Sequence, residues 1–181
     1  MGNVWKVDLL NGASVWMADA DVQNLDTARA LAPYEQRQHI LRSASFLIGH
    51  PYYWGGRSPH SPQTPPMSSK VTGMDCSGLV NLAYRSVGIE LPRDAHEQFL
   101  RAKPRTRPES ADLIFLSERS NSTRIVHVML YAGAGQIIEA PATGGTVRQI
   151  SAQERLKQPI EQLHAGSIVD GQTVLFGSYL P

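Results

Sequence analysis

The sequence predicts an α+β fold in which N-terminal helices pack on an antiparallel β-sheet. Apolar residues recur at helical spacing between residues 32 and 102, and β-rich runs separated by Gly, Asn, Ser and Thr fill residues 111–180. Helices followed by a series of strands are typical of α+β domains rather than of alternating βαβ units. With 181 residues, 41% of them hydrophobic, the chain is long enough to bury one core.

The first 32 residues are predicted to form a small appendage and its linker, and residues 33–181 form the main domain. Residues 4–17 contain two short β-rich runs on either side of Asn11-Gly12. That dipeptide favours a two-residue hairpin turn, so we expect a pair of antiparallel strands here. A loop leads from this hairpin to the main domain.

Three helices are predicted at the start of the main domain, over residues 32–49, 76–88 and 91–102. The first has Pro33 in its first turn, and its apolar residues follow the i, i+1, i+4, i+7, i+8 pattern of one buried stripe. A glycine ends each of the first two segments, as is typical of helix stops. Residues 57–72, with four prolines and four serines, predict a long loop that is either a functional flap or a mobile insertion.

The second half of the chain predicts a sheet of short strands. The period of the apolar residues changes from helical to two after residue 111. Five runs carry this signal: "DLIFL" (112–116), "IVHVMLYA" (125–132), "QIIEA" (136–140), "TVRQI" (146–150) and "TVLFGSYL" (173–180).

The charge and composition of the chain disfavour several classes of function. A net charge of +1, from 17 basic and 16 acidic residues, argues against nucleic acid or an anionic membrane as the main partner. No apolar run approaches the roughly 18 residues that a membrane span needs. The histidines show no metal-ligand spacing, and a single cysteine allows no internal disulfide, so we expect no metal and no cofactor.

The start of the chain bears on its compartment. Residues 1–6 contain no basic segment followed by an apolar one, and therefore do not resemble a signal peptide. We expect either a cytoplasmic protein or a fragment of an exported precursor.

The only cysteine, Cys76, lies where the second predicted helix begins. Free amides and the helix dipole at that end favour an anion, so a thiolate is favoured there. Asp75 is a candidate N-cap, and Gly78 would let another group approach the first turn closely. A nucleophilic thiol also needs a base, and the base needs an orienting partner.

The predicted sheet supplies such a pair. If the turn in "YAGAGQ" is centred on Gly133, His127 lies directly opposite Glu139, on the same face of the sheet. An imidazole and a carboxylate at that distance can hydrogen-bond, which fixes the tautomer and stabilises the imidazolium, as in a nucleophile–base–orienter triad. A one-residue slip would put the two side chains on opposite faces.

Each of these residues also has a structural interpretation. Cys76 can be a small buried hydrophobe, His127 a hydrogen-bonded core histidine, and Glu139 a solvated strand residue. Tyr52 and Trp54 can be core aromatics, although the two glycines that follow them are typical of a cleft wall. The occurrence of all these residues together favours a catalytic site.

The same residues lie in motifs that resemble those of the NlpC/P60 family of papain-like cysteine peptidases. Five segments match the family patterns in order: "GHPYYWGG" (49–56), "DCSGLV" (75–80), "LPRDAHEQ" (91–98), "ADLIF" (111–115) and "HVMLYAGAGQIIEA" (127–140). The resemblance covers roughly residues 33–180. The Pro-Arg-Asp segment is most similar to γ-D-glutamyl-L-diamino acid endopeptidases, which cut the bond between D-glutamate and a diamino acid in peptidoglycan stem peptides.

The resemblance implies a papain-like NlpC/P60 fold and a role for each matching residue. Cys76 would be the nucleophile, its backbone N–H an oxyanion donor, and His127 the general base. The positions that line the substrate cleft are Tyr52, Trp54, Asp75 and Ser77. Asp75 and Ser77 would hold the amino end of a short stem peptide. The N-terminal hairpin resembles the last strands of a bacterial SH3-like domain, of which only a remnant would be present.

Three features depart from the family pattern. The third polar residue is usually His, or sometimes Asn or Gln, whereas this chain has Glu139, whose charge should raise the imidazole pKa. The serine of the family's P-R-D-S segment is Ala95. The loop over residues 57–72 is longer than the usual link to the nucleophile motif.

The resemblance therefore implies a cysteine endopeptidase acting on the γ-D-glutamyl–diamino acid bond, with peptidoglycan stem peptides as its partners. Two alternatives stay open. One is a papain-like amidase or acyltransferase, which the Pro-Arg-Asp segment disfavours. The other is a non-catalytic module that binds cell-wall muropeptides.

Overall fold

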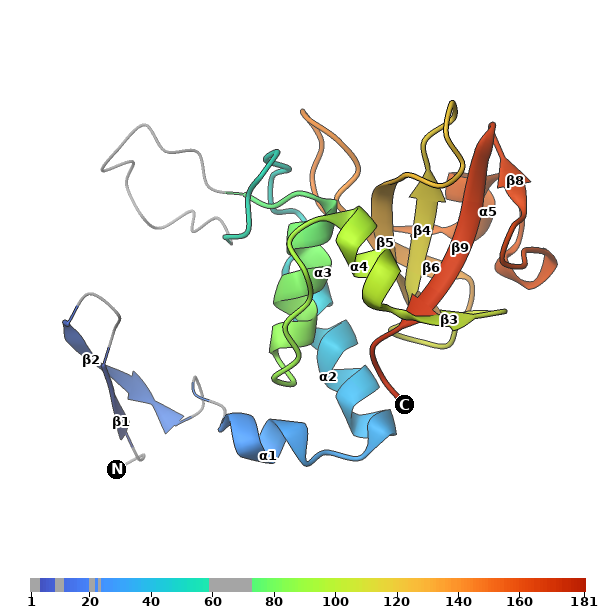
Figure 1. Ribbon diagram of the computed structural model, residues 1–181. Helices are drawn as coiled ribbons and strands as arrows, with labels where there is room; N and C mark the ends of the chain where they lie inside the picture. Colours follow the sequence, from blue (N-terminus) through green and yellow to red (C-terminus); the bar gives the residue numbers. More distant parts are fainter. Residues whose placement is uncertain (1–3, 9–11, 20–21, 23, 59–72) are drawn as a thin grey trace.

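The computed structural model describes residues 4–8, 12–19, 22, 24–58 and 73–181, and Figure 1 shows their arrangement. Asn11 of the predicted hairpin turn and most of the predicted long loop lie outside these ranges. The described residues form an N-terminal hairpin and a larger body in which helices pack against a sheet. The α+β architecture predicted from the sequence is confirmed.

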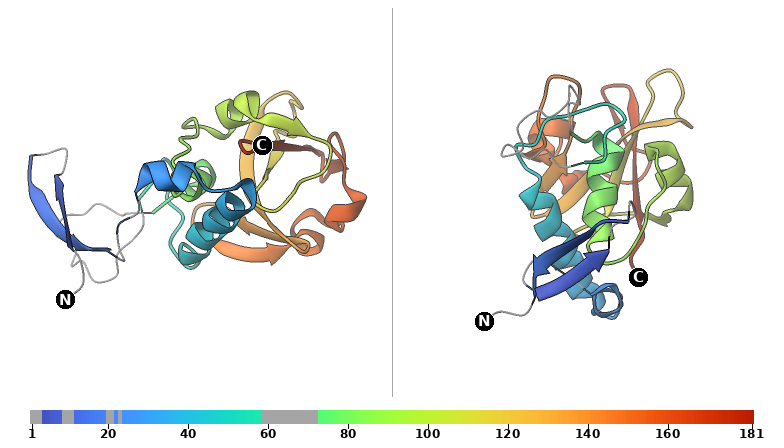
Figure 2. Two further views of the ribbon diagram at one scale, coloured as in Figure 1. Left: turned by 90° about the horizontal axis from the view of Figure 1, so that it is seen from below. Right: turned by 90° about the vertical axis from the view of Figure 1, so that its left-hand side faces the viewer.

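The N-terminal part consists of two strands and a short helix. Strands β1 (Val4–Asp8) and β2 (Ser14–Ala18) pair antiparallel, as predicted. Asp8 pairs with Ser14, so the strands are joined by a longer connection than the expected two-residue turn. Helix α1 (Leu25–Arg29), which the sequence analysis did not predict, follows them. The hairpin projects away from the body in Figure 1 and in the left view of Figure 2.

Three helices of the body confirm the predicted ones, each with a shorter range. They are α2 (Pro33–Phe46), α3 (Cys76–Arg85) and α4 (Ala95–Arg101). Pro33 occupies the first turn of α2. Backbone N–H groups in a first turn have no acceptor within the helix, so the N–H that proline lacks costs no helical hydrogen bond. The Glu35 side chain accepts a hydrogen bond from the Ala32 N–H at 3.0 Å and so caps the same end.

The main sheet is antiparallel throughout and contains all five predicted strands. Its strand order is β3 (Lys103–Arg105), β9 (Gln172–Ser178), β4 (Leu113–Ser117), β5 (Ile125–Gly133), β6 (Gln136–Glu139) and β7 (Arg148–Ser151), with β8 (Ile168–Val169) paired to β9. The sequence analysis did not predict β3, β8, helix α5 (Ala152–Leu156) or the short helix η2 (Ile160–Gln162).

Both faces of the central strands are buried, which gives the body two apolar layers. Leu113 and Phe115 of β4 pack into the core beneath α2, α3 and α4. Ile114 and Leu116, which point to the opposite face, pack in a second core with Leu156 of α5. The helices therefore cover one face of the sheet, while α5 and the segment that follows it cover the other.

A buried ion pair fastens α2 to the sheet. Arg37 of α2 donates from Nη1 to Asp112 Oδ1 at 2.8 Å and to the Ser110 carbonyl at 2.6 Å. Asp112, directly before β4, is fully buried, and its Oδ2 lies 3.7 Å from Arg105 Nε.

Among the described residues, no helix is long and apolar enough to cross a membrane.

Candidate active site

Cys76, the single cysteine of the sequence, is the first residue of helix α3. Asp75 is the N-cap of α3, and its Oδ1 accepts from the Gly78 N–H at 2.7 Å, as the sequence analysis predicted. A Cβ atom on Gly78 would lie 2.3 Å from the Gly56 carbonyl oxygen. Only glycine therefore lets the segment around Gly56 pack against the first turn of α3, where the Cys76 side chain lies, 9% exposed.

The register of β5 and β6 differs from the predicted one. The turn consists of Ala134 and Gly135, both with positive φ, and β5 carries an irregularity before Gly133. Leu130 consequently pairs with Ile138, and the prediction that His127 lies directly opposite Glu139 is wrong. The shift equals two residues, so both side chains still point to the same face.

His127 and Glu139 meet as diagonal neighbours on that face. His127 Nε2 lies 2.9 Å from Glu139 Oε2, and the two side chains are 11% and 0% exposed. Cys76 also interacts with this ring, since its hydrogen bonding and its charge both raise the His127 pKa. Burial lowers the His127 pKa, but the hydrogen bonds and negative charges of Cys76 and Glu139 outweigh it and raise the pKa to about 9.

Glu139 is held by two arginines as well as by His127. Arg148, directly opposite Glu139 on β7, donates from Nη2 to Oε1 at 2.7 Å. Arg155 of α5 donates from Nε to Oε2 at 2.9 Å and to Oε1 at 3.1 Å. Burial raises the Glu139 pKa, but the hydrogen bond and charge of His127, followed by those of Arg155, lower it to about 2. The alternative that Glu139 is a solvated strand residue is therefore wrong.

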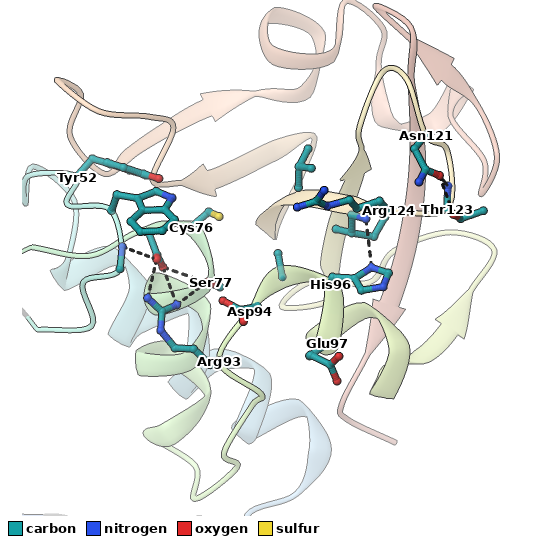
Figure 3. A pocket seen from close by; sticks show the side chains of 16 residues that line it. Tyr52, Cys76, Ser77, Arg93, Asp94, His96, Glu97, Asn121, Thr123 and Arg124 are labelled. Carbon is teal, nitrogen blue, oxygen red and sulfur yellow. Dashed lines mark hydrogen bonds and ion pairs between the residues drawn. The ribbon is translucent and has the colours of Figure 1, made fainter.

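A second charged network involves Asp75 and Ser77, the two neighbours of Cys76 in the chain. Arg93 donates to both carboxylate oxygens of Asp75, at 2.8 and 3.3 Å, and to Ser77 Oγ at 2.9 Å. The Gly55 N–H donates to Asp75 Oδ2 at 3.0 Å. Burial raises the Asp75 pKa, but the hydrogen bond from Arg93, supported by those from Gly78 and Ser77, lowers it overall. Figure 3 shows Arg93 reaching up to this network from below.

The sequence over residues 49–165 matches the NlpC/P60 family. The chain belongs to the NlpC/P60 family. The matched segment contains the cysteine, the histidine and the glutamate described above, together with both charged networks around them. The family resemblance inferred from the motifs is therefore confirmed.

The curated relatives that match this NlpC/P60 domain include proteins named as murein or peptidoglycan endopeptidases. The chain is 37% identical over 153 residues to murein DD-endopeptidase MepH of Escherichia coli strain K12, covering 82% of this chain and 49% of MepH. It is 30% identical over 121 residues to the γ-D-glutamyl-L-lysine dipeptidyl-peptidase of Bacillus subtilis strain 168, covering 66% of this chain and 37% of that protein. The chain thus spans about half or less of the length of these relatives.

Solved structures support the fold. Structures of RipA mutated at a cysteine, at a histidine and at a glutamate match with TM-scores of 0.60, 0.65 and 0.58. The one mutated at the glutamate is 28% identical and covers 82% of this chain and 64% of RipA's. RipD of Mycobacterium tuberculosis, described as a non-catalytic domain adapted to peptidoglycan binding, matches with a TM-score of 0.56 at 21% identity, over 80% of this chain and 98% of RipD's.

The NlpC/P60 domain has a cleft of about 890 Å³ with Cys76 in its wall (Figure 3). Tyr52 and Trp54 also line this cleft. Trp54 is 80% exposed, which contradicts the alternative that it is a core aromatic. Burial, followed by the charges of Cys76 and Asp75, raises the pKa of the half-buried Tyr52.

The opposite wall of the cleft was not predicted. It comes from α4 and from the segment between β4 and β5, and its polar members include His96, Asn121, Thr123 and Arg124 (Figure 3). His96 accepts a hydrogen bond at Nδ1 from the Ile125 N–H at 3.2 Å, which leaves the proton of a neutral ring on Nε2. His96 lies within the motif at residues 91–98 but was not predicted as a site residue, and no motif of the sequence analysis contained the other three.

A buried glutamine connects the two walls. Gln98 of α4 is fully buried, and its Nε2 donates to the Ser77 carbonyl at 3.1 Å and to the Pro92 carbonyl at 2.9 Å. It thereby fixes the first turn of α3 relative to the Pro-Arg-Asp segment.

Among the described residues, no group of three or more His, Cys, Asp or Glu side chains could hold a metal ion.

Proposed function

We propose that this chain is a cysteine endopeptidase that hydrolyses the γ-D-glutamyl–diamino acid bond of peptidoglycan stem peptides. The observation that carries the proposal is that Cys76, in the wall of a cleft of about 890 Å³, interacts with His127, whose Nε2 lies 2.9 Å from Glu139 Oε2. Membership of a family whose relatives are named peptidoglycan endopeptidases supports the substrate class.

The contacts support a specific role for each group. The Cys76 sulfur attacks the scissile carbonyl carbon, and the oxyanion develops beside the amides at the start of α3. The His127 imidazolium then protonates the leaving amine, which departs and leaves a thioester. Water attacks the thioester while His127 accepts its proton, and the carboxylic acid leaves as the Cys76 sulfur is regenerated. Glu139 orients the imidazole and stabilises its charge throughout.

RipA supports the assignment of Glu139 to the third position. RipA has been mutated at a cysteine, a histidine and a glutamate, the same three residue types as in this site. Its histidine and glutamate are twelve residues apart, as His127 and Glu139 are. This equal spacing supports the same role for Glu139 as for the glutamate of RipA, a relative that is 36% identical over 114 residues.

The substrate-binding assignments follow the resemblance. Tyr52 and Trp54 offer aromatic surface on one side of Cys76, and we assign Asp75 and Ser77 to the amino end of the stem peptide. Asp75 already accepts hydrogen bonds from Arg93 at both oxygens, so a substrate ammonium would share this carboxylate with a guanidinium. We therefore expect Asp75→Asn to disturb the cleft wall as well as the binding of the amine.

Digestion of defined peptides tests the proposed bond. The purified chain is incubated with L-Ala-γ-D-Glu-diaminopimelate, with the same peptide lacking a free L-Ala amine, and with a D,D-cross-linked dimer, and products are identified by mass spectrometry. We expect release of L-Ala-D-Glu from the first peptide. Cys76→Ala should abolish this cleavage while the circular dichroism spectrum stays unchanged, and unaltered turnover in that variant would remove the nucleophile assignment.

The same digestion separates the competing functions. The similarity to MepH, over 82% of this chain, favours a D,D-endopeptidase as the second candidate, and cleavage of only the cross-linked dimer would support it. Cleavage of other amide or ester bonds would favour the amidase or acyltransferase alternative. Binding of all peptides without any product, together with alkylation of Cys76 as slow as that of an ordinary thiol, would support a non-catalytic muropeptide-binding module.

A further inference from the structure

The third residue of the site differs in charge from the residue usual in this position, and this has a physical consequence. A neutral His, Asn or Gln can be buried once its hydrogen bonds are satisfied, but a carboxylate also needs compensation of its charge. Glu139 has no exposed surface. Its charge is compensated by His127 on one side and by two arginines on the other.

The two arginines reach Glu139 from different elements that adjoin in the chain. Arg148 lies directly opposite Glu139 in the pairing of β6 with β7. Helix α5 begins at Ala152, immediately after β7 ends, and its N-cap Ser151 accepts from the Glu154 N–H. This sharp change from strand to helix brings Arg155 back over the Glu139 carboxylate.

The two oxygens of the Glu139 carboxylate have different hydrogen-bond partners. Oε1 accepts from both arginines, through Arg148 Nη2 at 2.7 Å, Arg148 Nε at 3.1 Å and Arg155 Nε at 3.1 Å. Oε2 accepts from Arg155 Nε at 2.9 Å and pairs with His127 Nε2 at 2.9 Å. The carboxylate is thus prevented from rotating away from the imidazole.

We propose that Arg148 and Arg155 are positioning residues that act on His127 through Glu139, holding the carboxylate against Nε2 and cancelling its charge. The inference rests on the proposed function only in taking His127 as the general base. Glu139, Arg148 and Arg155 then form one unit that takes the place of a single neutral residue. We call this unit the Glu139 clamp.

Other charged groups surround the Glu139 clamp and could contribute to its field. On the inner side, His127 interacts with Cys76, and the charge of Cys76 also acts on the Tyr52 hydroxyl. On the outer side, a pocket of about 410 Å³ is lined by both arginines and by three further charged residues: Glu154, Lys157 and Asp170. Lys157 donates to the Glu154 carbonyl and supplies a matched control, because it carries the same charge in the same pocket as the arginines.

The proposal predicts shifts of opposite sign in the titration of His127. Arg155→Gln removes a positive charge near the imidazolium while Arg148 and His127 keep Glu139 ionised, so the His127 midpoint should rise by about one pH unit. Glu139→Gln leaves two uncompensated guanidinium groups beside the ring and should lower the midpoint by more than about one pH unit. The double variant should lie between the two single variants.

Histidine NMR measures these midpoints without any substrate. The full chain is labelled with ¹³C at histidine Cε1, the His127 signal is assigned from its loss in His127→Asn, and titrations are recorded for each variant. Arg155→Lys, which keeps the charge, and Lys157→Gln, which removes a charge that does not touch Glu139, should both leave the midpoint near that of the wild type. Turnover should fall about tenfold in Arg155→Gln through kcat, with KM unchanged.

Each outcome decides one point. A His127 midpoint that is unchanged or lower in Arg155→Gln would overturn the proposal, and an equal shift in Lys157→Gln would show a general field instead of a clamp. If the midpoints shift as predicted but no stem peptide is cleaved, the clamp stands and the proposed function fails. If peptides are cleaved and the midpoints do not move, the proposed function stands and the clamp fails.

Discussion

Two fully buried carboxylates of this domain, Asp112 and Glu139, have similar surroundings but differ in the partner that each one holds. Asp112 lies directly before β4 and Glu139 is the last residue of β6, and each has two arginines nearby. Arg37 contacts Asp112 at 2.8 Å, with Arg105 at 3.7 Å, and Arg148 and Arg155 contact Glu139 at 2.7 and 2.9 Å.

The difference lies in the remaining partner. Asp112 Oδ2 also accepts from the Glu109 backbone N–H, a group that does not titrate, and the pair fastens helix α2 to strand β4. Glu139 instead binds the ring of His127, which titrates and contacts a thiol at the cleft. A buried carboxylate with arginine partners is therefore no sign of a catalytic site by itself, whereas a titratable partner that interacts with a thiol in a cleft wall is such a sign.

The largest expected effect is on stability and concerns the Asp112 pair. Asp112→Asn leaves Arg37, 7% exposed, with only the Glu109 carboxylate and backbone oxygens around it. Loss of one partner of a buried ion pair costs about 3–5 kcal/mol, and we expect a loss of that size in the free energy of unfolding, measured by urea denaturation. Turnover per folded molecule should not change. A loss of turnover without a loss of stability would abolish the contrast with Glu139.

The next effect is on catalysis and concerns Glu139. Glu139→Gln retains an oxygen that can accept from His127 Nε2 but removes the charge that stabilises the imidazolium. We expect kcat to fall about 100-fold, equivalent to about 2.7 kcal/mol in the activation barrier. Steady-state kinetics on the tripeptide stem measures it, with urea denaturation of the same variant as the control. A fall in stability as large as that of Asp112→Asn, with kcat preserved, would make Glu139 a second structural carboxylate.

The proximity of His127 and Glu139 is the part of this comparison that the sequence predicted, and an error in register did not remove it. Side chains on a strand alternate with a period of two, so a shift by two residues preserves the face. The turn at Ala134-Gly135 and the irregularity in β5 together produced that shift, and neither can be read from the pattern of apolar residues. The catalytic helix start was predictable because Asp75, Cys76 and Gly78 are local signals.

The arginines of both clusters were not predictable in the same way. Arg37 and Asp112 are 75 residues apart in the chain, and their contact depends on how α2 packs on the sheet. Arg155 lies on a five-residue helix that follows β7 without a loop. The sequence therefore contains no turn residue from which the start of this helix could be predicted. Arg148 could have been found from the pairing of the strands at 136–140 and 146–150, had that register been derived.

The pH dependence of stability separates the two carboxylates further. The His127 pKa is raised from 6.5 to about 9, so the stabilisation from its protonated form is complete below pH 6.5 and is lost as the pH rises through 9. The Glu139 pKa is lowered from 4.5 to about 2, so its contribution is complete above pH 4.5 and is lost as the pH falls towards 2. The pair therefore stabilises the domain most between about pH 4.5 and 6.5.

Urea denaturation at several pH values tests this window. Between pH 6.5 and 10, the wild type should lose about 3 kcal/mol more than His127→Asn, which lacks the titrating ring. Asp112→Asn should show the same alkaline loss as the wild type, because its cluster contains no histidine. An identical pH profile in the wild type and His127→Asn would mean that the imidazolium does not contribute to stability.

The smallest effect is expected for an exposed ion pair, which completes the series. Arg85 Nε and Glu90 Oε1 are 3.7 Å apart, and their side chains are 57% and 80% exposed. Water already solvates both groups, and holding two long side chains together opposes the weak attraction, so Arg85→Gln should change the free energy of unfolding by less than about 0.5 kcal/mol. Salt of about 1 M, which reduces the screening length to about 3 Å, should erase even this difference but leave the loss in Asp112→Asn almost intact. A loss above 2 kcal/mol in Arg85→Gln would mean that burial does not rank these three pairs, and the contrast between Asp112 and Glu139 would then need another physical cause.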